Sequence, residues 1–270
     1  MKIIISHDVD HLTVWEHKAD LILPKFVVRS FIECATGYIS YKELGYRFRS
    51  FVLNKWQNIA ELMQFDRMNK IPATFFIGVA RGKGMCYSLD KANMWIYNIL
   101  HEGFDAGVHG VAYNDRRGID EEWHAFRALA NKEKYGIRLH YLRRTGETLG
   151  LLEKAGYLFD ASIYAMENPY KVGDMWEFPL HLVDGRIINK GVGWQSRSLA
   201  QVKDDTKRTI GEAFDSHINY FSVLLHDRYF SDGFLTWREW YVWLVDYADT
   251  NGIEFVGYRD AIKALEKDRS

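Results

Sequence analysis

Strand-like apolar runs alternate with helix-like segments along this chain, and the alternation limits the fold more than any other feature. The runs typical of buried strands lie at residues 3–5, 73–78, 103–108, 136–140, 176–182, 220–225 and 253–256. Apolar residues at helical spacing lie between most of them, at residues 59–68, 92–100, 123–130, 145–155 and 241–248. This order favours a parallel sheet covered by helices. The sequence therefore predicts an α/β fold whose parallel strands close, or nearly close, into a barrel.

The chain is predicted to form a single domain over residues 1–270. Its length suffices to bury one large core, and no repeat, low-complexity tract or linker rich in Gly, Ser and Pro interrupts the alternation. A stretch without a clear period, residues 11–51, follows the first strand and is interpreted as an insertion. Three roles fit such an insertion: covering a site, contacting a lipid-linked substrate at a membrane surface, or packing against the core.

Composition argues against several classes of protein. The formal net charge of −1 gives no sign of a surface for nucleic acid. The two cysteines, Cys34 and Cys86, indicate neither a disulfide framework nor a cysteine metal site. The chain reaches His7 and Asp8 too soon for a signal peptide, and no run is long enough for a transmembrane segment. We therefore expect a cytoplasmic protein, and peripheral contact with the inner face of the membrane stays open.

The first strand ends in a pair of carboxylates, in the sequence Ser6-His7-Asp8-Val9-Asp10. Side chains alternate along a strand, so Asp8 and Asp10 are expected on the same side. Two carboxylates in one cavity repel each other unless a cation, a proton or a histidine compensates them. The alternative is a solvated turn after an ordinary strand. The partners that would decide between the two must come from elsewhere in the chain.

Basic side chains follow other predicted strands at their carboxyl ends. They are His109, Arg138, His140 and His226. In a barrel of parallel strands these ends meet on one face, where the active site lies. One carboxylate with several imidazoles suits zinc or another divalent transition metal, which lowers the pKa of water and polarises a carbonyl group. The second carboxylate is then free to act as a general base, and a separate histidine to protonate a leaving amine.

Five motifs occur in the order found in a known family. They are Ser6–Asp10, Ala73–Gly78, Asp105–His109, Gly136–Tyr141 and Val223–Asp227. In these motifs the chain resembles the polysaccharide deacetylases, the NodB-homology proteins of carbohydrate esterase family four, from its first strand to about Leu265. The resemblance implies a distorted, NodB-like (β/α) barrel of seven or eight parallel strands. It also implies metal-dependent hydrolysis of an N-acetyl or similar N-acyl group on a sugar in surface polysaccharide biosynthesis, such as that of O-antigen or capsule.

The resemblance also implies roles for single residues. Asp8 falls where the family has its general base, and Arg138 where an arginine orients and tunes that base. The backbone N–H of Tyr141 falls where the family completes an oxyanion hole. His226 matches the histidine that acts as general acid, and Asp184 is the carboxylate expected to hold it.

A divalent metal, most simply zinc, is part of what the resemblance implies, and here the chain departs from the family. Asp10 matches the metal-binding aspartate and His109 the first of two histidines. Tyr113 occupies the position of the second histidine, so the third ligand must come from elsewhere. His140 is the favoured substitute, because it shares a strand face with Arg138 and its imidazole is a good zinc ligand. The alternatives are Asn114 and Asp115.

Three functions stay open from the sequence. The first is an N-deacetylase acting on a carbohydrate that is free, nucleotide-linked or lipid-linked. The second is a non-catalytic glycan-binding relative, suggested by the missing second histidine and the abundant aromatic residues. The third takes Asp8-Val9-Asp10 as the metal and nucleotide-sugar motif of a glycosyltransferase, although such a motif normally follows a nucleotide-binding domain.

Overall fold

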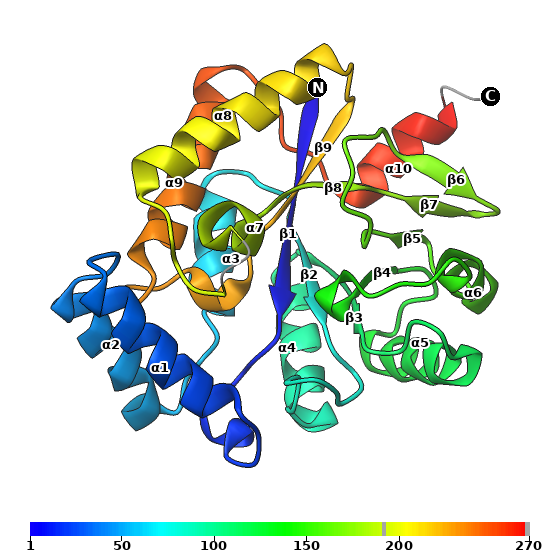
Figure 1. The fold of residues 1–270 in the computed structure, drawn as a ribbon. Helices are drawn as coiled ribbons and strands as arrows, with labels where there is room; N and C mark the ends of the chain where they lie inside the picture. Colours follow the sequence, from blue (N-terminus) through cyan, green and yellow to red (C-terminus); the bar gives the residue numbers. More distant parts are fainter. Residues whose placement is uncertain (191–192, 268–270) are drawn as a thin grey trace.

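A curled sheet of nine strands forms the centre of the computed structural model, which describes residues 1–190 and 193–267 (Figure 1). In chain order the strands are β1 (Lys2–Val9), β2 (Thr74–Ile77), β3 (Asp105–Gly110), β4 (Gly136–Leu139), β5 (Phe159–Asp160), β6 (Tyr170–Val172), β7 (Met175–Glu177), β8 (Leu180–Val183) and β9 (Tyr220–Leu224). Their order across the sheet is β6-β7-β5-β4-β3-β2-β1-β9-β8. β1 therefore lies inside the sheet, hydrogen-bonded to β2 and to β9.

The predicted α/β fold is confirmed. The strand expected at residues 253–256 is wrong, because only an isolated bridge from Phe255 to Ile3 forms there. Two further details were not predicted from the sequence. Every pair of neighbouring strands is parallel except β6 and β7, which form an antiparallel hairpin. The strand expected at residues 176–182 is divided into β7, which pairs with β5, and β8, which pairs with β9. The N–H of Leu180 donates to the carbonyl of Ile163 at 2.6 Å, which links the chain after β5 to β8. This link curls the sheet toward a closed barrel.

Helices surround the curled sheet (Figure 1). They are α1 (Ile22–Ala35), α2 (Tyr41–Leu53), α3 (Ile59–Met68), α4 (Leu89–His101), α5 (Arg116–Ala130), α6 (Thr148–Ala155), α7 (Asp184–Asn189), α8 (Leu199–Asp215), α9 (Leu235–Thr250) and α10 (Tyr258–Lys267), with short 3-10 turns η1 (Trp15–His17), η2 (His140–Leu142) and η3 (Asp227–Tyr229). α6 ends before Gly156, as predicted, and a φ of 97° there suits glycine. Among the described residues, no helix has both the length and the apolar character needed to cross a bilayer.

The segment predicted as an insertion, residues 11–51, forms η1, α1 and most of α2, near the carboxyl end of β1 (Figure 1). Buried Glu33 of α1 accepts hydrogen bonds from Arg29, from Arg47 of α2 and from the backbone N–H of Gln195. These bonds join both helices to a segment that is distant in sequence. That the whole chain forms one domain with this insertion stays a prediction.

Aromatic rings and one guanidinium fill part of the sheet's interior. The ring centres of Phe76, Phe159 and Tyr258 lie 4.3 to 6.3 Å apart. The guanidinium of Arg138 lies 4.4 Å from the ring centre of Phe76 and donates to the hydroxyl of Tyr258. Gly136 of β4 leaves room for the ring of Phe159, because a β-carbon there would overlap that ring. The packing of these rings therefore helps to position Arg138, a predicted site residue.

We expect Gly136→Ala to destabilise the protein by about 1–3 kcal/mol, because the added β-carbon forces the ring of Phe159 to move. The matched control is Gly45→Ala in α2, where a β-carbon meets no atom and alanine favours the helix by about 1 kcal/mol. Urea unfolding followed by circular dichroism measures both changes. Wild-type stability of the Gly136→Ala variant would contradict the close packing described here.

Candidate functional site

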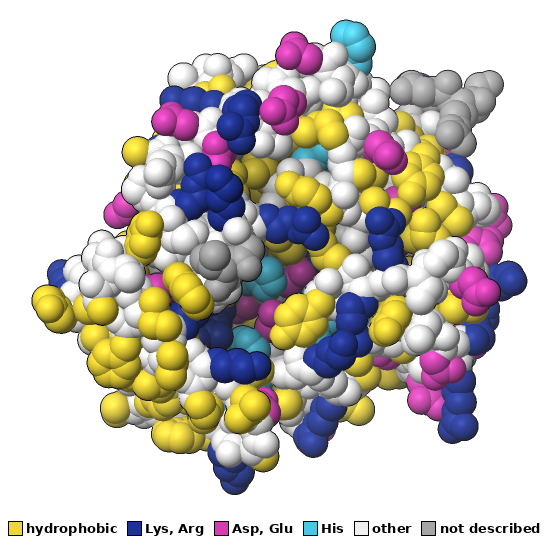
Figure 2. Space-filling view, viewed as in Figure 1, with side chains coloured by type: hydrophobic (Ala, Val, Ile, Leu, Met, Phe, Trp, Pro, Cys, Tyr) yellow, Lys and Arg dark blue, Asp and Glu magenta, His cyan; other side chains and the backbone are white. Residues whose placement is uncertain are grey.

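The predicted site residues gather near the carboxyl ends of β1, β3, β4 and β9, beside a cavity of 780 Å³. Figure 2 shows a hollow in this face of the molecule, with histidine and carboxylate side chains inside it and Lys and Arg side chains around it. Asp10, Tyr141 and His226 line the cavity. Ile22 and Val28 of α1 also line it, so the predicted insertion supplies part of its wall.

Asp10, His109 and His140 form a group whose ligand atoms all lie within 4.8 Å of one another. The Nε2 atom of His109 is 3.0 Å from Oδ1 of Asp10, and Nε2 of His140 is 3.5 Å from the same oxygen. These are the three residues that were predicted as metal ligands. One carboxylate and two imidazoles are a common set of three protein ligands at catalytic zinc sites, so the residues present fit a divalent ion.

Hydrogen bonding and burial set the charges of this group. Nδ1 of His109 lies 3.0 Å from the carbonyl oxygen of Arg138, which can only accept, so Nδ1 carries a proton and Nε2 faces the carboxylates. Burial lowers the pKa of His140 to about 4, which keeps its imidazole neutral, as a metal ligand must be. Burial alone would raise the pKa of Asp10, but the hydrogen bond from His109 and the charge of His226 lower it well below its ordinary value. Burial lowers the pKa of His109, but the carboxylates of Asp8 and Asp10 raise it above its ordinary value. The group thus combines the ionised carboxylate of Asp10 with the neutral imidazole of His140 and with a His109 whose protonated form these carboxylates favour.

Asp8 is buried beside this group and pairs with Arg138. Nη1 of Arg138 donates to Oδ1 of Asp8 at 2.9 Å, and the other oxygen of Asp8 lies 3.9 Å from Nε2 of His109. Asp8 and Asp10 both face His109, so the two carboxylates lie on the same side of the chain. The hydrogen bond from Arg138 holds one oxygen of Asp8 and leaves the other facing the group of Asp10, His109 and His140.

His226 lies against a buried carboxylate. Its Nδ1 is 2.9 Å from Oδ1 of Asp184, and its backbone N–H donates to Oδ2 of the same residue. Its Nε2 lies 3.7 Å from Oδ2 of Asp10. Burial lowers the pKa of His226, but the carboxylates of Asp184 and Asp10 raise it well above its ordinary value. This histidine can therefore hold a proton at Nε2 and donate it into the cavity.

Tyr141 follows His140 at the edge of the cavity. Its backbone has a φ of 60°, and its exposed ring stacks on the imidazole of His140 with ring centres 4.2 Å apart. The turn therefore brings the backbone of Tyr141 next to the group of Asp10, His109 and His140. The oxyanion-hole role of its N–H group stays a prediction.

The alternative ligands lie elsewhere. Asn114 and Asp115 line a separate hollow between the ends of β2 and β3 and the start of α5. The carboxylate of Asp115 caps α5 by accepting two backbone N–H groups, and so is not free for a metal. Tyr113, at the position of the family's second histidine, packs against the guanidinium of Arg143, which is 4.8 Å from the ring centre.

A chain of polar side chains without a predicted role lies next to the site. Nδ1 of His11 is 3.0 Å from Nε2 of His17, and Nδ1 of His17 is 2.9 Å from Oδ2 of Asp20. His11 lines the cavity together with Asp10. The thiol of Cys86 donates to Oδ2 of Asp20 at 3.6 Å, so His17, Asp20 and Cys86 form a second group with donor atoms suited to a metal. His17 and Asp20 are close in sequence, but Cys86 is distant from both, so no motif would have indicated this group.

Two buried carboxyl groups near the site were also not predicted. Glu122 of α5 accepts hydrogen bonds from the N–H groups of Val111 and Ala112 and so fixes the loop that follows His109. Asp227 accepts a hydrogen bond from the N–H of Asn58, and burial raises its pKa to about 8. Asp227 is therefore protonated at neutral pH. The contact of Asp227 joins distant segments, and that of Glu122 depends on how the loop after β3 folds back onto α5. No pattern in a single sequence indicates either contact.

No family model and no curated protein matches the sequence, whereas several solved structures match the fold. A protein from Mycobacterium smegmatis, assigned as a polysaccharide deacetylase, aligns over 99% of this chain and 91% of its own, with a TM-score of 0.66 and 14% identity. The allantoinase PuuE aligns over 96% and 87%, with a TM-score of 0.62 and 15% identity. BA3943, a pseudoenzyme of carbohydrate esterase family four from Bacillus anthracis, aligns over 96% and 64%, with a TM-score of 0.52 and 8% identity.

The chain therefore has the fold of the polysaccharide deacetylases, and the resemblance predicted from the five motifs is confirmed at the level of the fold. An allantoinase and a pseudoenzyme are similar to it as well. Because proteins with different activities share one fold, the reaction must be argued from the site residues.

The stability of the protein is expected to fall as the pH rises from about 5 to about 8, in part because of Asp227. The carboxyl group has a pKa of about 8 in the folded state and about 3.9 in an unfolded chain. The folded state therefore binds the extra proton in this window and loses stability as the proton dissociates. In Asp227→Asn the decline in unfolding free energy should be smaller by at least about 1 kcal/mol. Urea unfolding at both pH values tests this, and an equal decline in both proteins would contradict it.

Proposed function

We propose that the protein is a metal-dependent carbohydrate deacetylase, which hydrolyses an N-acetyl or similar N-acyl group on a sugar. The convergence of Asp10, His109 and His140 beside the Asp8–Arg138 pair is the observation that carries the proposal. It joins a ligand set for a divalent ion to a separate carboxylate base. Zinc is the proposed ion because the donors are one oxygen and two imidazole nitrogens.

Asp8 would act as the general base of this reaction. A divalent ion held by Asp10, His109 and His140 supplies Lewis-acid chemistry, which polarises the carbonyl group of the amide and makes water more acidic. Asp8 accepts the proton of the attacking water at the oxygen that faces His109, while Arg138 holds its other oxygen. The backbone N–H of Tyr141 would stabilise the negative charge that develops on the carbonyl oxygen.

His226 would act as the general acid. Amide hydrolysis releases an amine, which leaves only when its nitrogen is protonated. The carboxylate of Asp184 orients the imidazole through Nδ1 and favours its protonated form, so the proton at Nε2 faces the cavity. Asp8 and His226 thus divide the two proton transfers between a base paired with a cation and an acid paired with a carboxylate.

The substrate is proposed to be a nucleotide- or lipid-linked sugar of surface polysaccharide biosynthesis, processed in the cytoplasm. Two free cysteines, Cys34 and Cys86, agree with a reducing compartment. Large apolar side chains are exposed along the predicted insertion and the end of α2 that follows it, namely Leu21, Val28, Phe31, Tyr41, Val52 and Leu53. Figure 2 shows hydrophobic side chains gathered over α1 and α2. An apolar surface next to the cavity supports peripheral contact with the inner face of the membrane.

The second candidate is a non-catalytic glycan-binding relative. Tyr113 replaces the family's second histidine, and a pseudoenzyme of that family shares the fold. A glycosyltransferase that uses Asp8 and Asp10 together on a metal is less well supported, because Asp8 is buried and bonded to Arg138. Metal binding and acetate release separate these candidates.

In calorimetric titration, chelator-treated protein is expected to bind zinc tightly at the group of Asp10, His109 and His140. Asp10→Ala, His109→Ala and His140→Ala should each weaken this binding by at least about tenfold, because each removes one ligand. Asn114→Ala should leave it unchanged, as should the matched control His101→Ala at an exposed histidine of α4. A second bound ion that is lost in Cys86→Ser belongs to the group of His17, Asp20 and Cys86. Unchanged binding in all three ligand variants would contradict the assigned site.

The zinc-loaded protein is expected to release acetate from N-acetylglucosamine, either as an oligosaccharide or linked to a nucleotide. Asp8→Asn should lower kcat by about 10²–10⁴-fold, because it removes the general base, while zinc binding is retained. Enzymatic detection of acetate measures turnover, and calorimetry confirms that the variant still holds the ion. Glycan binding without turnover in the zinc-loaded wild type would favour the non-catalytic relative.

A further inference from the structure

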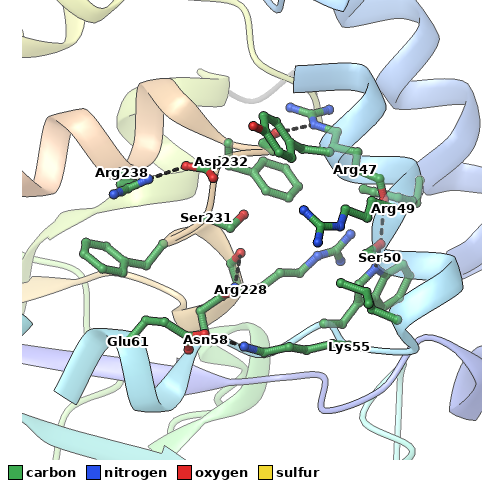
Figure 3. A pocket seen from close by; sticks show the side chains of 17 residues that line it. Arg47, Arg49, Ser50, Lys55, Asn58, Glu61, Arg228, Ser231, Asp232 and Arg238 are labelled. Carbon is green, nitrogen blue, oxygen red and sulfur yellow. Dashed lines mark hydrogen bonds and ion pairs between the residues drawn. The ribbon is translucent and has the colours of Figure 1, made fainter. Parts of the chain in front are cut away.

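A second hollow, of 380 Å³, lies between α2, α3 and the segment from η3 to the start of α9 (Figure 3). Five cationic side chains line it, namely Arg47, Arg49, Lys55, Arg228 and Arg238. Phe26 and Arg228 also line the cavity that contains Asp10 and His226. The two hollows therefore share a wall, and Phe26 and Arg228 form part of it.

The guanidinium of Arg228 packs on aromatic rings and forms no ion pair with the described residues. It lies 4.0 Å from the ring centre of Trp56 and 4.6 Å from that of Phe26, which hold its plane in place. Its Nε atom is buried and has no hydrogen-bond acceptor among the described residues. A buried polar nitrogen without an acceptor costs free energy, and a ligand oxygen would recover it.

Arg49 extends into the same hollow from α2, opposite Arg228 (Figure 3). The other cations of the lining are already neutralised: Arg47 pairs with Glu33, Lys55 with Glu61, and Arg238 with Asp232. No comparable ion pair is found for Arg49 or Arg228 among the residues that the structure describes.

The nearby carboxyl groups do not pair with these two guanidinium groups. Asp10 lines the neighbouring cavity together with Arg228, but its oxygens face His109, His140 and His226. Asp227 precedes Arg228 in the chain, but its Oδ2 is bonded to Asn58, and burial keeps the group protonated at neutral pH. The guanidinium groups of Arg49 and Arg228 thus converge on one hollow, and neither forms an ion pair with a described carboxylate. An oxyanion would compensate both through charge-assisted hydrogen bonds.

We propose that this hollow is a binding site for a phosphate-like oxyanion, held by Arg49 and Arg228. The oxyanion has two chemical sources: an anionic group of the substrate, which reaches across the shared wall, or a separate anion. Only the first source rests on the proposed deacetylase function. The experiment therefore measures binding before it measures turnover.

Calorimetric titration with inorganic phosphate, and with sulfate as a weaker metal ligand, tests the site directly. Arg49→Gln should weaken binding by about tenfold or more, since a hydrogen bond to a charged group is lost. The matched control is Arg117→Gln at an exposed arginine of α5, which should bind like wild type. Asp10→Asn, which disables the metal group, should also retain anion binding. Arg228→Lys keeps the charge, so its binding should fall less than that of Arg228→Gln.

Two results would overturn the proposal. One is the absence of phosphate and sulfate binding at millimolar concentration in the wild type. The other is binding that is lost in Asp10→Asn and kept in Arg49→Gln, since the anion would then occupy the metal group. Arg49 is exposed, so Arg49→Gln keeps the test decisive even if a change at the packed Arg228 unfolds the protein.

Turnover then assigns the source of the anion. If the anion belongs to the substrate, Arg49→Gln should raise KM about tenfold for nucleotide-linked N-acetylglucosamine and leave KM for a neutral oligosaccharide unchanged. If the anion is separate, phosphate should change turnover of the neutral oligosaccharide in wild type and have no effect in Arg49→Gln. Anion binding without turnover of either compound would count against the deacetylase and leave the anion site standing.

Discussion

The pair formed by Arg138 and Asp8 is the interaction on which the site depends. The guanidinium crosses the interior of the curled sheet from β4, bonds Asp8 on β1, and also donates to the carbonyl of Ala161 and the hydroxyl of Tyr258. Four segments that are distant in sequence thus meet at one side chain. A buried charge persists only where its partners are complete, so the fold and the ionised carboxylate stabilise each other. The carbonyl of the same arginine residue orients His109, which couples Asp8 to the group of Asp10, His109 and His140.

Positively and negatively charged side chains lie close together in the site. Asp10 lies among three imidazoles, of which His226 is favoured in its protonated form by Asp184 and His140 is kept neutral by burial. Asp8 faces a guanidinium on one side and His109 on the other. An ionised carboxylate and a protonated imidazole can therefore exist side by side at neutral pH, which is what a reaction with both a base and an acid requires.

Residues at strand ends could be predicted from the sequence, and residues that act through packing could not. Asp8, Asp10, His109, Arg138 and His226 follow apolar runs, and parallel strands bring their carboxyl ends together on one face, so local patterns sufficed. The split of residues 176–182 into β7 and β8 was not predicted, because it depends on which strands lie beside that run. Arg228 carries no motif, and its importance comes from the rings of Trp56 and Phe26, which only the folded chain places around it.

The hydrogen bonds of Glu33 hold together part of the wall of the cavity and so limit how the cavity can open. This one buried carboxylate receives Arg29 from its own helix, Arg47 from α2 and the backbone of Gln195. If α1 moved outward alone, Glu33 would move with it and leave the buried guanidinium of Arg47 without its carboxylate, at a cost of about 3–5 kcal/mol. The two helices and the segment at Gln195 therefore behave as one stiff wall. A ligand must enter through the existing opening, so the fixed outline of that opening, rather than a hinged flap, would select which molecules reach the cavity.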